Sequence, residues 1–194
     1  DNGVVNFQEG FVLYKQENFD QAISHFNQVA DQTGGSVSER ARTAVQNIKR
    51  FKRQYQAGRQ AISQSQWSKA TSQLRSALAT DKKVADSGFF AGSITRRLAR
   101  VTAEKGIAAL DSKNYDQANK LYKQAKQYSS SQSRVRALLR AIEKEAQGLY
   151  IRAAEKKKTN PGKAAKLCRR IMNMLPSSSS QYQKAQTLLE EVSN

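Results

Sequence analysis

One pattern occurs four times and constrains the fold more than any other feature of the chain. It consists of a glycine, an aromatic residue nine positions later, an alanine three positions further on, and an apolar residue four positions after that. The four copies are Gly10, Phe19, Ala22 and Phe26; Gly58, Trp67, Ala70 and Leu74; Gly106, Tyr115, Ala118 and Tyr122; and Gly148, Ala164 and Cys168, the last with four extra residues in its middle. Internal repetition of this kind predicts a stack of similar units and not a single globular core.

The spacing within each copy predicts a pair of packed helices. The glycine lets a neighbouring helix approach closely, and the alanine and the residue four positions later fall on one face of a second helix. The glycines are 48 residues apart in the first three copies and 42 in the last interval, so each later copy carries extra residues before its glycine. Apolar residues in those extra stretches recur in steps of three and four. We therefore expect first helices of roughly 25 residues and second helices of roughly 12.

Three gapless segments carry a family resemblance: GFVLYKQENFDQAISHFNQVA (10–30), GRQAISQSQWSKATSQLRSAL (58–78) and GIAALDSKNYDQANKLYKQAK (106–126). They resemble the core of the tetratricopeptide repeat (TPR), and the fourth copy ends with Pro176, where that family often places its proline. The resemblance implies an all-α fold, a right-handed superhelical solenoid of about four TPR-like helix pairs with a C-terminal capping helix. The usual repeat of that family has 34 residues, so the longer spacing here predicts a wider superhelix.

The helix pairs and the cap account for nearly the whole chain, so we expect residues 1–194 to form a single TPR-like domain. Its repeats are predicted around 4–31, 38–80, 84–128 and 131–176, and its cap at 180–193. Polar or Gly/Pro-containing turns are predicted at 31–37, 81–83, 129–133 and 159–162. Because the chain begins at Asp1 and not at methionine, we also expect it to be a fragment of a longer protein.

The segment 87–93, SGFFAGS, fits the helical scheme poorly because glycine weakens helix propensity. We expect it to pack closely against the second copy, with Gly88 and Gly92 giving room. The alternative is that Phe89 or Phe90 is exposed and contacts a partner.

Charge is the second informative feature. The chain has 33 Lys and Arg residues against 16 Asp and Glu, a net charge of +17. Residues 1–36 carry −4, residues 37–83 carry +9, residues 84–130 carry +4 and residues 131–194 carry +8. This polarity favours an acidic partner at the basic end, or self-association of opposite ends. The alternative is that Lys and Arg only coat the solvent face of long helices.

Residues suited to catalysis are scarce. His25 is the only histidine, so no histidine and cysteine cluster can bind zinc, and Cys168 occupies a packing position of the repeat. The chain has no phosphate-binding glycine loop and no nucleophile elbow. We predict a protein that is not an enzyme and that needs no cofactor or metal. It has no stretch of 18 apolar residues to span a membrane, so we expect a soluble protein, cytoplasmic or envelope-associated.

In the TPR family the first helix of each pair lines the inner surface. Counting from the four glycines, the polar and aromatic residues expected there are Tyr14, Lys52, Tyr55, Arg59, Arg100 and Arg152. These side chains would suit a peptide or helix with acidic and apolar residues. The family members that grip the C-terminal carboxylate of heat-shock chaperones use lysine and asparagine at several such positions, and this chain has no asparagine there. Packing against the next repeat is at least as good an interpretation for Phe7, Ile107 and Leu149.

The sequence therefore predicts a non-enzymatic interaction scaffold that binds a protein or peptide partner in its concave groove within a larger assembly. The alternative is an electrostatic binder of nucleic acid or of an anionic membrane surface. Nucleic acid is the less favoured partner, because the aromatic residues occupy packing positions and few remain for base stacking. The composition is basic and rich in Gln and Ser, from which we expect a bacterial protein.

Overall fold

The computed structural model describes the backbone of residues 2–193 and the side chains of residues 7–193, and this part of the chain is all-helical. Contacts divide it into two compact units, unit 1 up to Leu98 and unit 2 from Ala99 onward. The helices are α1 (Asn2–Lys15), α2 (Phe19–Gln32), α3 (Gly35–Ser63), α4 (Trp67–Val84), α5 (Ala91–Asp111), α6 (Tyr115–Tyr128), α7 (Ser133–Lys156), α8 (Pro161–Met174) and α9 (Ser180–Ser193). The prediction of an all-α fold is confirmed, and α5 begins in unit 1 and ends in unit 2.

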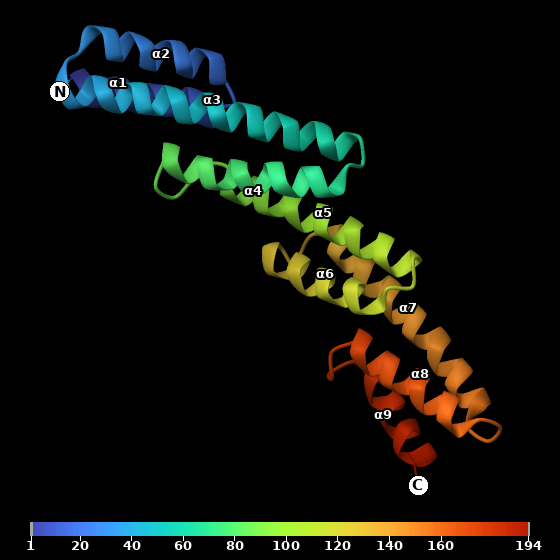
Figure 1. Cartoon of the computed structure of the whole chain (residues 1–194). Coiled ribbons are helices and arrows are strands. Elements are labelled where there is room, and N and C mark those ends of the chain that lie inside the picture. The colour runs from blue at the N-terminus through green and yellow to red at the C-terminus, as the bar shows by residue number, and fades with distance from the viewer. Residues whose placement is uncertain (1, 194) are drawn as a thin grey trace. The chain divides into compact units, whose positions relative to one another are not determined.

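In unit 1 each helix packs against the next one along the chain. Figure 1 shows α2 beside α1, α3 running along both, and α4 returning antiparallel to α3. The core is rich in aromatic rings: Phe51 stacks on Tyr55 with 5.2 Å between ring centroids, and on Phe90 at 4.9 Å. Phe26 is fully buried against Phe7 and Phe11. Buried aromatic pairs of this kind add directional contacts to the burial of apolar surface.

The turn between the two helices of a pair is the same in the first three copies. A residue seven positions after the repeat glycine has a positive φ: Glu17 at 62°, Ser65 at 55° and Lys113 at 59°. The N–H of the next residue bonds the carbonyl five positions earlier, as in Asn18 to Leu13 at 3.0 Å. This is the Schellman ending of a helix, in which glycine normally supplies the left-handed residue. The repeat seen in the sequence is thus repeated in the backbone.

The repeat glycines do not all serve the expected close approach. A Cβ at Gly10 would lie 2.5 Å from the Phe26 ring, and a Cβ at Gly58 would lie 2.9 Å from Leu74. In both cases the neighbour is the apolar residue sixteen positions later, as the pattern predicts. A Cβ at Gly106 would clash instead with Leu138 of α7, and no atom lies within 4 Å of a Cβ at Gly148. The expected close approach at the glycine is confirmed for the first two copies. In the third copy the glycine allows a close approach, but of α7 and not of its own second helix, and in the fourth copy the expectation is wrong.

Helix lengths follow the prediction in outline. The first helices α3, α5 and α7 have 29, 21 and 24 residues, and the second helices α2, α6 and α8 have 14 each. The second helix α4 is longer than predicted, with 18 residues, and α1, the first helix of the first pair, has only 14. Turns occur within two of the predicted stretches, at residues 33–34 and 129–132, and a third turn at residues 157–160 overlaps the stretch predicted at 159–162 but ends before that stretch does, where α8 begins. The turn predicted at 81–83 is wrong, because α4 continues to Val84 and the break falls at residues 85–90.

Asp81 explains why α4 continues. Its side chain is fully buried, and its carboxylate accepts three hydrogen bonds. The Tyr14 hydroxyl donates to Oδ1 at 2.8 Å, the Phe89 N–H to Oδ1 at 3.1 Å, and the Phe90 N–H to Oδ2 at 2.7 Å. A buried carboxylate is tolerated only with such partners. Asp81 therefore holds α1, the end of α4 and the segment before α5 together.

The segment 87–93 packs mainly as expected. Phe90 is buried against the aromatic core of α3, and Gly88 has a φ of 68° with the Asp81 carboxylate 2.6 Å from where a Cβ would lie. Gly88 therefore gives room for the carboxylate. A Cβ at Gly92 would meet only the Arg96 side chain, at an ordinary contact distance of 3.8 Å, so this glycine does not give room for close packing. Phe89 keeps 37% of its surface exposed, and its contact with a partner stays a prediction.

Unit 2 is built in the same way from the second part of α5 and from α6 to α9. Its core is formed by small and aliphatic side chains, among them Leu138, Ile142 and Leu149 of α7. Cys168 is fully buried there, as its repeat position predicts. Asn119 of α6 donates to the carbonyl of Asn173 in α8 at 2.7 Å, which ties these two helices.

Candidate functional site

Tyr14 and Tyr55, two of the six residues expected to bind a partner, lie in the core of unit 1. Tyr14 is 0% exposed and Tyr55 is 1% exposed. Both rings contact Phe51 and Phe90, and burial is the main cause that raises the pKa of the Tyr14 hydroxyl, followed by the charge of Asp81 and the hydrogen bond to it. Neither ring lies at the surface of the folded unit, which corrects the expectation that both tyrosines line an open groove.

Lys52 and Arg59 lie on the side of α3 that faces α2, and both are ion-paired. Lys52 Nζ is 2.7 Å from Asp20, and Arg59 Nη1 is 3.1 Å from Glu17. The Arg59 guanidinium also lies 5.7 Å from the centroid of the Tyr55 ring. These contacts cross from one helix pair to the next, so they give the two cations a role in fixing α2 on α3. Their binding to a partner stays a prediction.

Arg100 and Arg152 belong to unit 2, and both side chains are exposed. Arg152 Nε donates to the carbonyl of Gly148 at 3.3 Å. Nearby, Lys113 Nζ is 3.0 Å from Glu145, and the hydrogen bond from Lys113 is the main cause that lowers the pKa of Glu145, with a smaller contribution from Arg152. Partner binding by these two arginines also stays a prediction.

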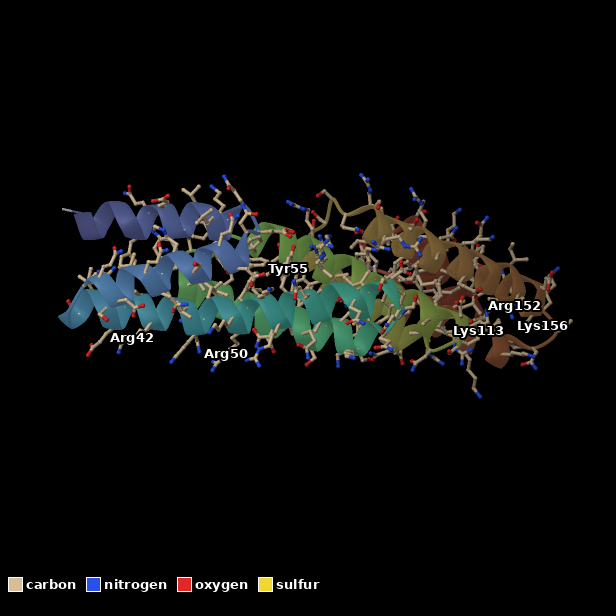
Figure 2. The ribbon with its side chains drawn as sticks, turned by 90° about the horizontal axis from the view of Figure 1, so that it is seen from above. Arg42, Arg50, Tyr55, Lys113, Arg152 and Lys156 are labelled. Carbon is tan, nitrogen blue, oxygen red and sulfur yellow. The ribbon has the colours of Figure 1, made fainter. Side chains whose placement is uncertain are left out.

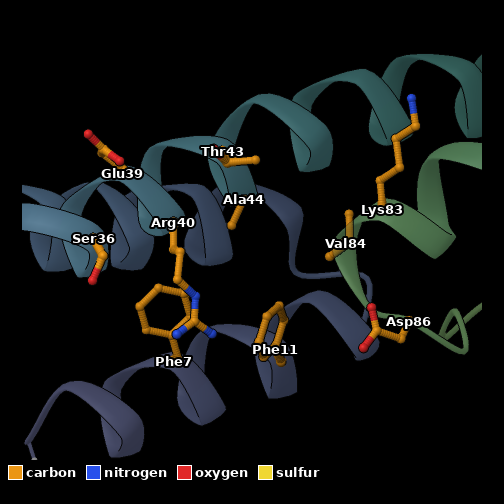
Figure 3. A pocket seen from close by; sticks show the side chains of 10 residues that line it. All are labelled: Phe7, Phe11, Ser36, Glu39, Arg40, Thr43, Ala44, Lys83, Val84 and Asp86. Atoms are coloured by element: carbon orange, nitrogen blue, oxygen red, sulfur yellow. The ribbon is translucent and has the colours of Figure 1, made fainter.

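One concave feature of unit 1 is a hollow of about 450 Å³, which we call the apolar hollow after its phenylalanine side chains (Figure 3). It lies between α1, the first turns of α3 and the end of α4. Its lining consists of Phe7, Phe11, Ser36, Glu39, Arg40, Thr43, Ala44, Lys83, Val84 and Asp86.

Charge and apolar surface are mixed in the apolar hollow. The Arg40 guanidinium stands 5.0 Å from the centroid of the Phe7 ring, as Figure 3 shows. Two cations, Arg40 and Lys83, and two carboxylates, Glu39 and Asp86, share the lining with Phe7, Phe11, Ala44 and Val84, so polar surface is at least as extensive there as apolar surface. A concave surface that combines apolar side chains with convergent polar groups can bind a ligand or a peptide side chain.

An exposed apolar surface on α1 adjoins this hollow through Phe11, which lines both. It is formed by Gln8, Phe11, Val12, Lys15 and Phe89, and we call it the α1 patch. Val12 is 53% exposed and Phe89 is 37% exposed, and the ammonium of Lys15 lies 5.9 Å from the centroid of the Phe89 ring. Exposed apolar surface beside a hollow is typical of a protein-binding site.

A third feature lies further along α3. Arg50, Arg53, Gln54 and Ala57 of α3, with Gln73 of α4, line a shallow hollow of about 420 Å³, which we call the arginine hollow. Neither arginine has a carboxylate within ion-pairing distance among the residues that the structure describes. Gln54 Oε1 accepts a hydrogen bond from the Thr80 hydroxyl at 2.7 Å, so its amide nitrogen is the end left to donate.

No family model matches this chain. The comparisons with curated proteins and with solved structures gave no match either.

Within the described range of the chain, no cluster of three His, Cys, Asp or Glu side chains could hold a metal ion. Burial raises the pKa of the Cys168 thiol, which disfavours the reactive thiolate. None of the helices in the same range is long and apolar enough to cross a membrane.

Sequence reasoning missed most of the residues that line these hollows. Val12 carried a signal, since FVLY at 11–14 is four apolar residues in a row and one helical face cannot bury all four. Arg50 and Arg53 gave no distinct signal, because in sequence they resemble the solvated face of a long helix. Thr43 and Lys83 gave no sequence signal, because their place in a hollow depends on where α4 ends.

Proposed function

We propose that this chain is a non-enzymatic protein-interaction module that binds a segment of a partner protein in the apolar hollow of unit 1. The observation that carries the proposal is the hollow itself, whose phenylalanine side, Phe7 and Phe11, continues into the exposed Val12 and Phe89 of the α1 patch. A partner segment with two or three apolar side chains would cover this surface and remove it from water. Each such side chain contributes about 1.5–3 kcal/mol when fully buried.

The repeat architecture is part of this proposal. We propose that the helix pairs form a right-handed TPR-like solenoid with α9 as its cap. The repeated left-handed residue at Glu17, Ser65 and Lys113 supports it, because three copies end their first helix in the same way. An experimentally determined structure in which successive pairs are related by one right-handed rotation would establish the solenoid, and a different rotation at each step would exclude it.

The test is affinity capture by the full chain from nuclease-treated lysate, washed at two salt concentrations. Thr43→Trp places a large ring in the apolar hollow at an exposed position, so folding is retained while the hollow is filled. Gln56→Trp is the matched control, exposed on the same helix but outside both hollows. We expect one discrete protein to be retained at the higher salt by the wild type and Gln56→Trp and to be lost with Thr43→Trp. A protein held equally by Thr43→Trp would refute this site.

A second candidate function is electrostatic binding of nucleic acid or an anionic membrane surface. It is favoured by Arg42, Lys49, Arg50 and Arg53, four exposed cations of α3 without an ion pair in the described part of the chain. Figure 2 shows Arg42 and Arg50 pointing outward along one edge of unit 1. Binding of this kind weakens steeply as salt rises, because phosphate contacts release counterions. Captured material that disappears with nuclease or with salt would favour this second function.

A further inference from the structure

The apolar hollow and the arginine hollow lie on one face of α3. The residues of α3 that line them include positions 39, 43, 50, 53 and 57, and Asn47, between the two hollows, donates to the carbonyl of Lys83 in α4 at 3.5 Å. Steps of three, four and seven residues keep side chains on the same side of a helix. One linear ligand lying along α3 therefore reaches both hollows.

The two hollows differ in chemistry. The apolar hollow has two cations and two carboxylates and is balanced in charge, whereas the arginine hollow has two guanidinium groups, two amide side chains and no carboxylate. Its surroundings do not neutralise it, since residues 37–83 hold eleven Lys and Arg residues and only two acids. One of these acids, Asp81, is buried and engaged by three donors, and the other, Glu39, lies in the apolar hollow.

We infer that the partner segment carries at least two carboxylates that bind Arg50 and Arg53, at a fixed distance from the apolar residues that enter the apolar hollow. This rests on the proposed function and specifies its ligand. Guanidinium groups donate in a planar fork that fits a carboxylate with two hydrogen bonds, and Gln54 and Gln73 add donors at the rim. Thr43 and Arg53 are ten residues apart, about 15 Å along a helix.

That distance sets the register of the ligand. It corresponds to about ten residues of a partner helix, or to about four or five residues of an extended chain. A protein segment is favoured over nucleic acid because the arginine hollow offers no aromatic ring on which a base could stack, and because the neighbouring hollow holds two carboxylates, Glu39 and Asp86, beside its apolar side chains.

The experiment is a selection of binders from a displayed library of random 16-residue peptides, with the intact 194-residue chain as the target. We expect selected peptides to combine apolar residues with a pair of Asp or Glu residues. The pair should lie about ten residues from the apolar residues in a helical peptide, or about four or five residues from them in an extended one. The consensus peptide is then synthesised, and its affinity is measured for the wild type and for two double variants.

The first double variant is Arg50→Gln with Arg53→Gln, and the matched control is Arg42→Gln with Lys49→Gln. Both remove two exposed, unpaired cations from the same helix, but only the first changes the arginine hollow. We expect the first to weaken binding about tenfold and the control to change it less than twofold. An equal loss in both, or a consensus without acidic residues, would overturn the inference.

The result also separates this inference from the proposed function. Peptide binding that is abolished by Thr43→Trp but indifferent to Arg50 and Arg53 would keep the proposed site and reject its acidic ligand. If no peptide is selected, or if Thr43→Trp leaves binding unchanged, the proposed function fails together with the inference. A labelled DNA duplex is tested in parallel, and duplex binding that depends on Arg50 and Arg53 at physiological salt would assign the arginine hollow to phosphate groups instead.

Discussion

Substitution of the buried Asp81 tests the structure of unit 1 directly, because its carboxylate joins three segments of the chain. Asp81→Asn keeps the size of the side chain but replaces one acceptor oxygen by a donor. Three donors face the two oxygens, Tyr14 Oη at 2.8 Å and the N–H groups of Phe89 and Phe90 at 3.1 and 2.7 Å. An asparagine must therefore turn its NH₂ group toward at least one backbone N–H.

The cost follows from what is lost. A hydrogen bond to a charged acceptor contributes about 1.5–3 kcal/mol, and a buried N–H left without a partner costs about 1–3 kcal/mol. Because these two contributions overlap, we expect Asp81→Asn to lower the unfolding free energy of unit 1 by about 2–4 kcal/mol. Trp67 is the only tryptophan of the chain and lies in α4, so its fluorescence during urea unfolding reports on unit 1 specifically. Asp86→Asn, at an exposed position, is the control and should change the free energy by less than about 0.5 kcal/mol.

The burial of Tyr14 and its hydrogen bond to Asp81 also predict how the stability of unit 1 depends on pH. Burial, and then Asp81, raise the pKa of the Tyr14 hydroxyl above its ordinary value in the folded state. The stabilisation is therefore fully present below about pH 10 and is lost as the pH rises above that value, by up to about 1.4 kcal/mol per pH unit. Tyr14→Phe removes this dependence, so the wild type and Tyr14→Phe should converge in stability above pH 10. An Asp81→Asn variant as stable as the wild type, or a stability difference for Tyr14→Phe that is constant up to pH 12, would refute the role given to this carboxylate.

Three further predictions concern single positions. Gly148→Ala should stabilise the protein by about 0.5–1 kcal/mol in thermal or urea unfolding, because its Cβ meets open space in a helix, whereas Gly106→Ala should destabilise it by about 1–3 kcal/mol. Ser65→Gly should add about 0.5–1 kcal/mol, because Ser65 holds a left-handed backbone that glycine adopts without strain, and a loss of stability would contradict the observed turn. Lys113→Met should raise the pKa of Glu145 toward its ordinary value in an NMR titration. The stabilisation from Glu145 is present above the ordinary pKa of glutamate and is lost as the pH falls through the lowered value, so this variant should lose less stability in acid than the wild type.

Periodicity was sufficient to predict the helices, because a stripe of apolar residues at steps of three and four determines which face is buried whatever the neighbours are. Of the four residues predicted at the last position of the pattern, Phe26, Leu74 and Cys168 are buried and Tyr122 is partly buried. The burial of Asp81 could not be predicted, because it depends on hydrogen-bond donors that lie 8, 9 and 67 residues away in the sequence. A polar run such as Asp81-Lys82-Lys83 indicates a turn only when no such partners exist.

The candidate site was less predictable than the fold. Tyr14 and Tyr55 were placed in a groove because first helices line the inner surface of the TPR family, yet both rings are covered by Phe90 from the segment before α5. Whether a first-helix residue faces a groove depends on how that connecting segment packs, which the repeat pattern does not encode. Arg50 and Arg53 differ from the paired Lys52 and Arg59 only in which side of α3 they occupy, and that difference needs the position of α2.

The unequal lengths of the paired helices account for the position of the apolar hollow. α3 has 29 residues and α4 has 18, and Asn47 already contacts Lys83 in the last turn of α4. The first three turns of α3 therefore extend past the end of α4, where Phe7 and Phe11 of α1 form the opposite wall. A repeat of the usual length would have no such extension, so the extra residues that separate this chain from the TPR pattern are the ones that create the apolar hollow.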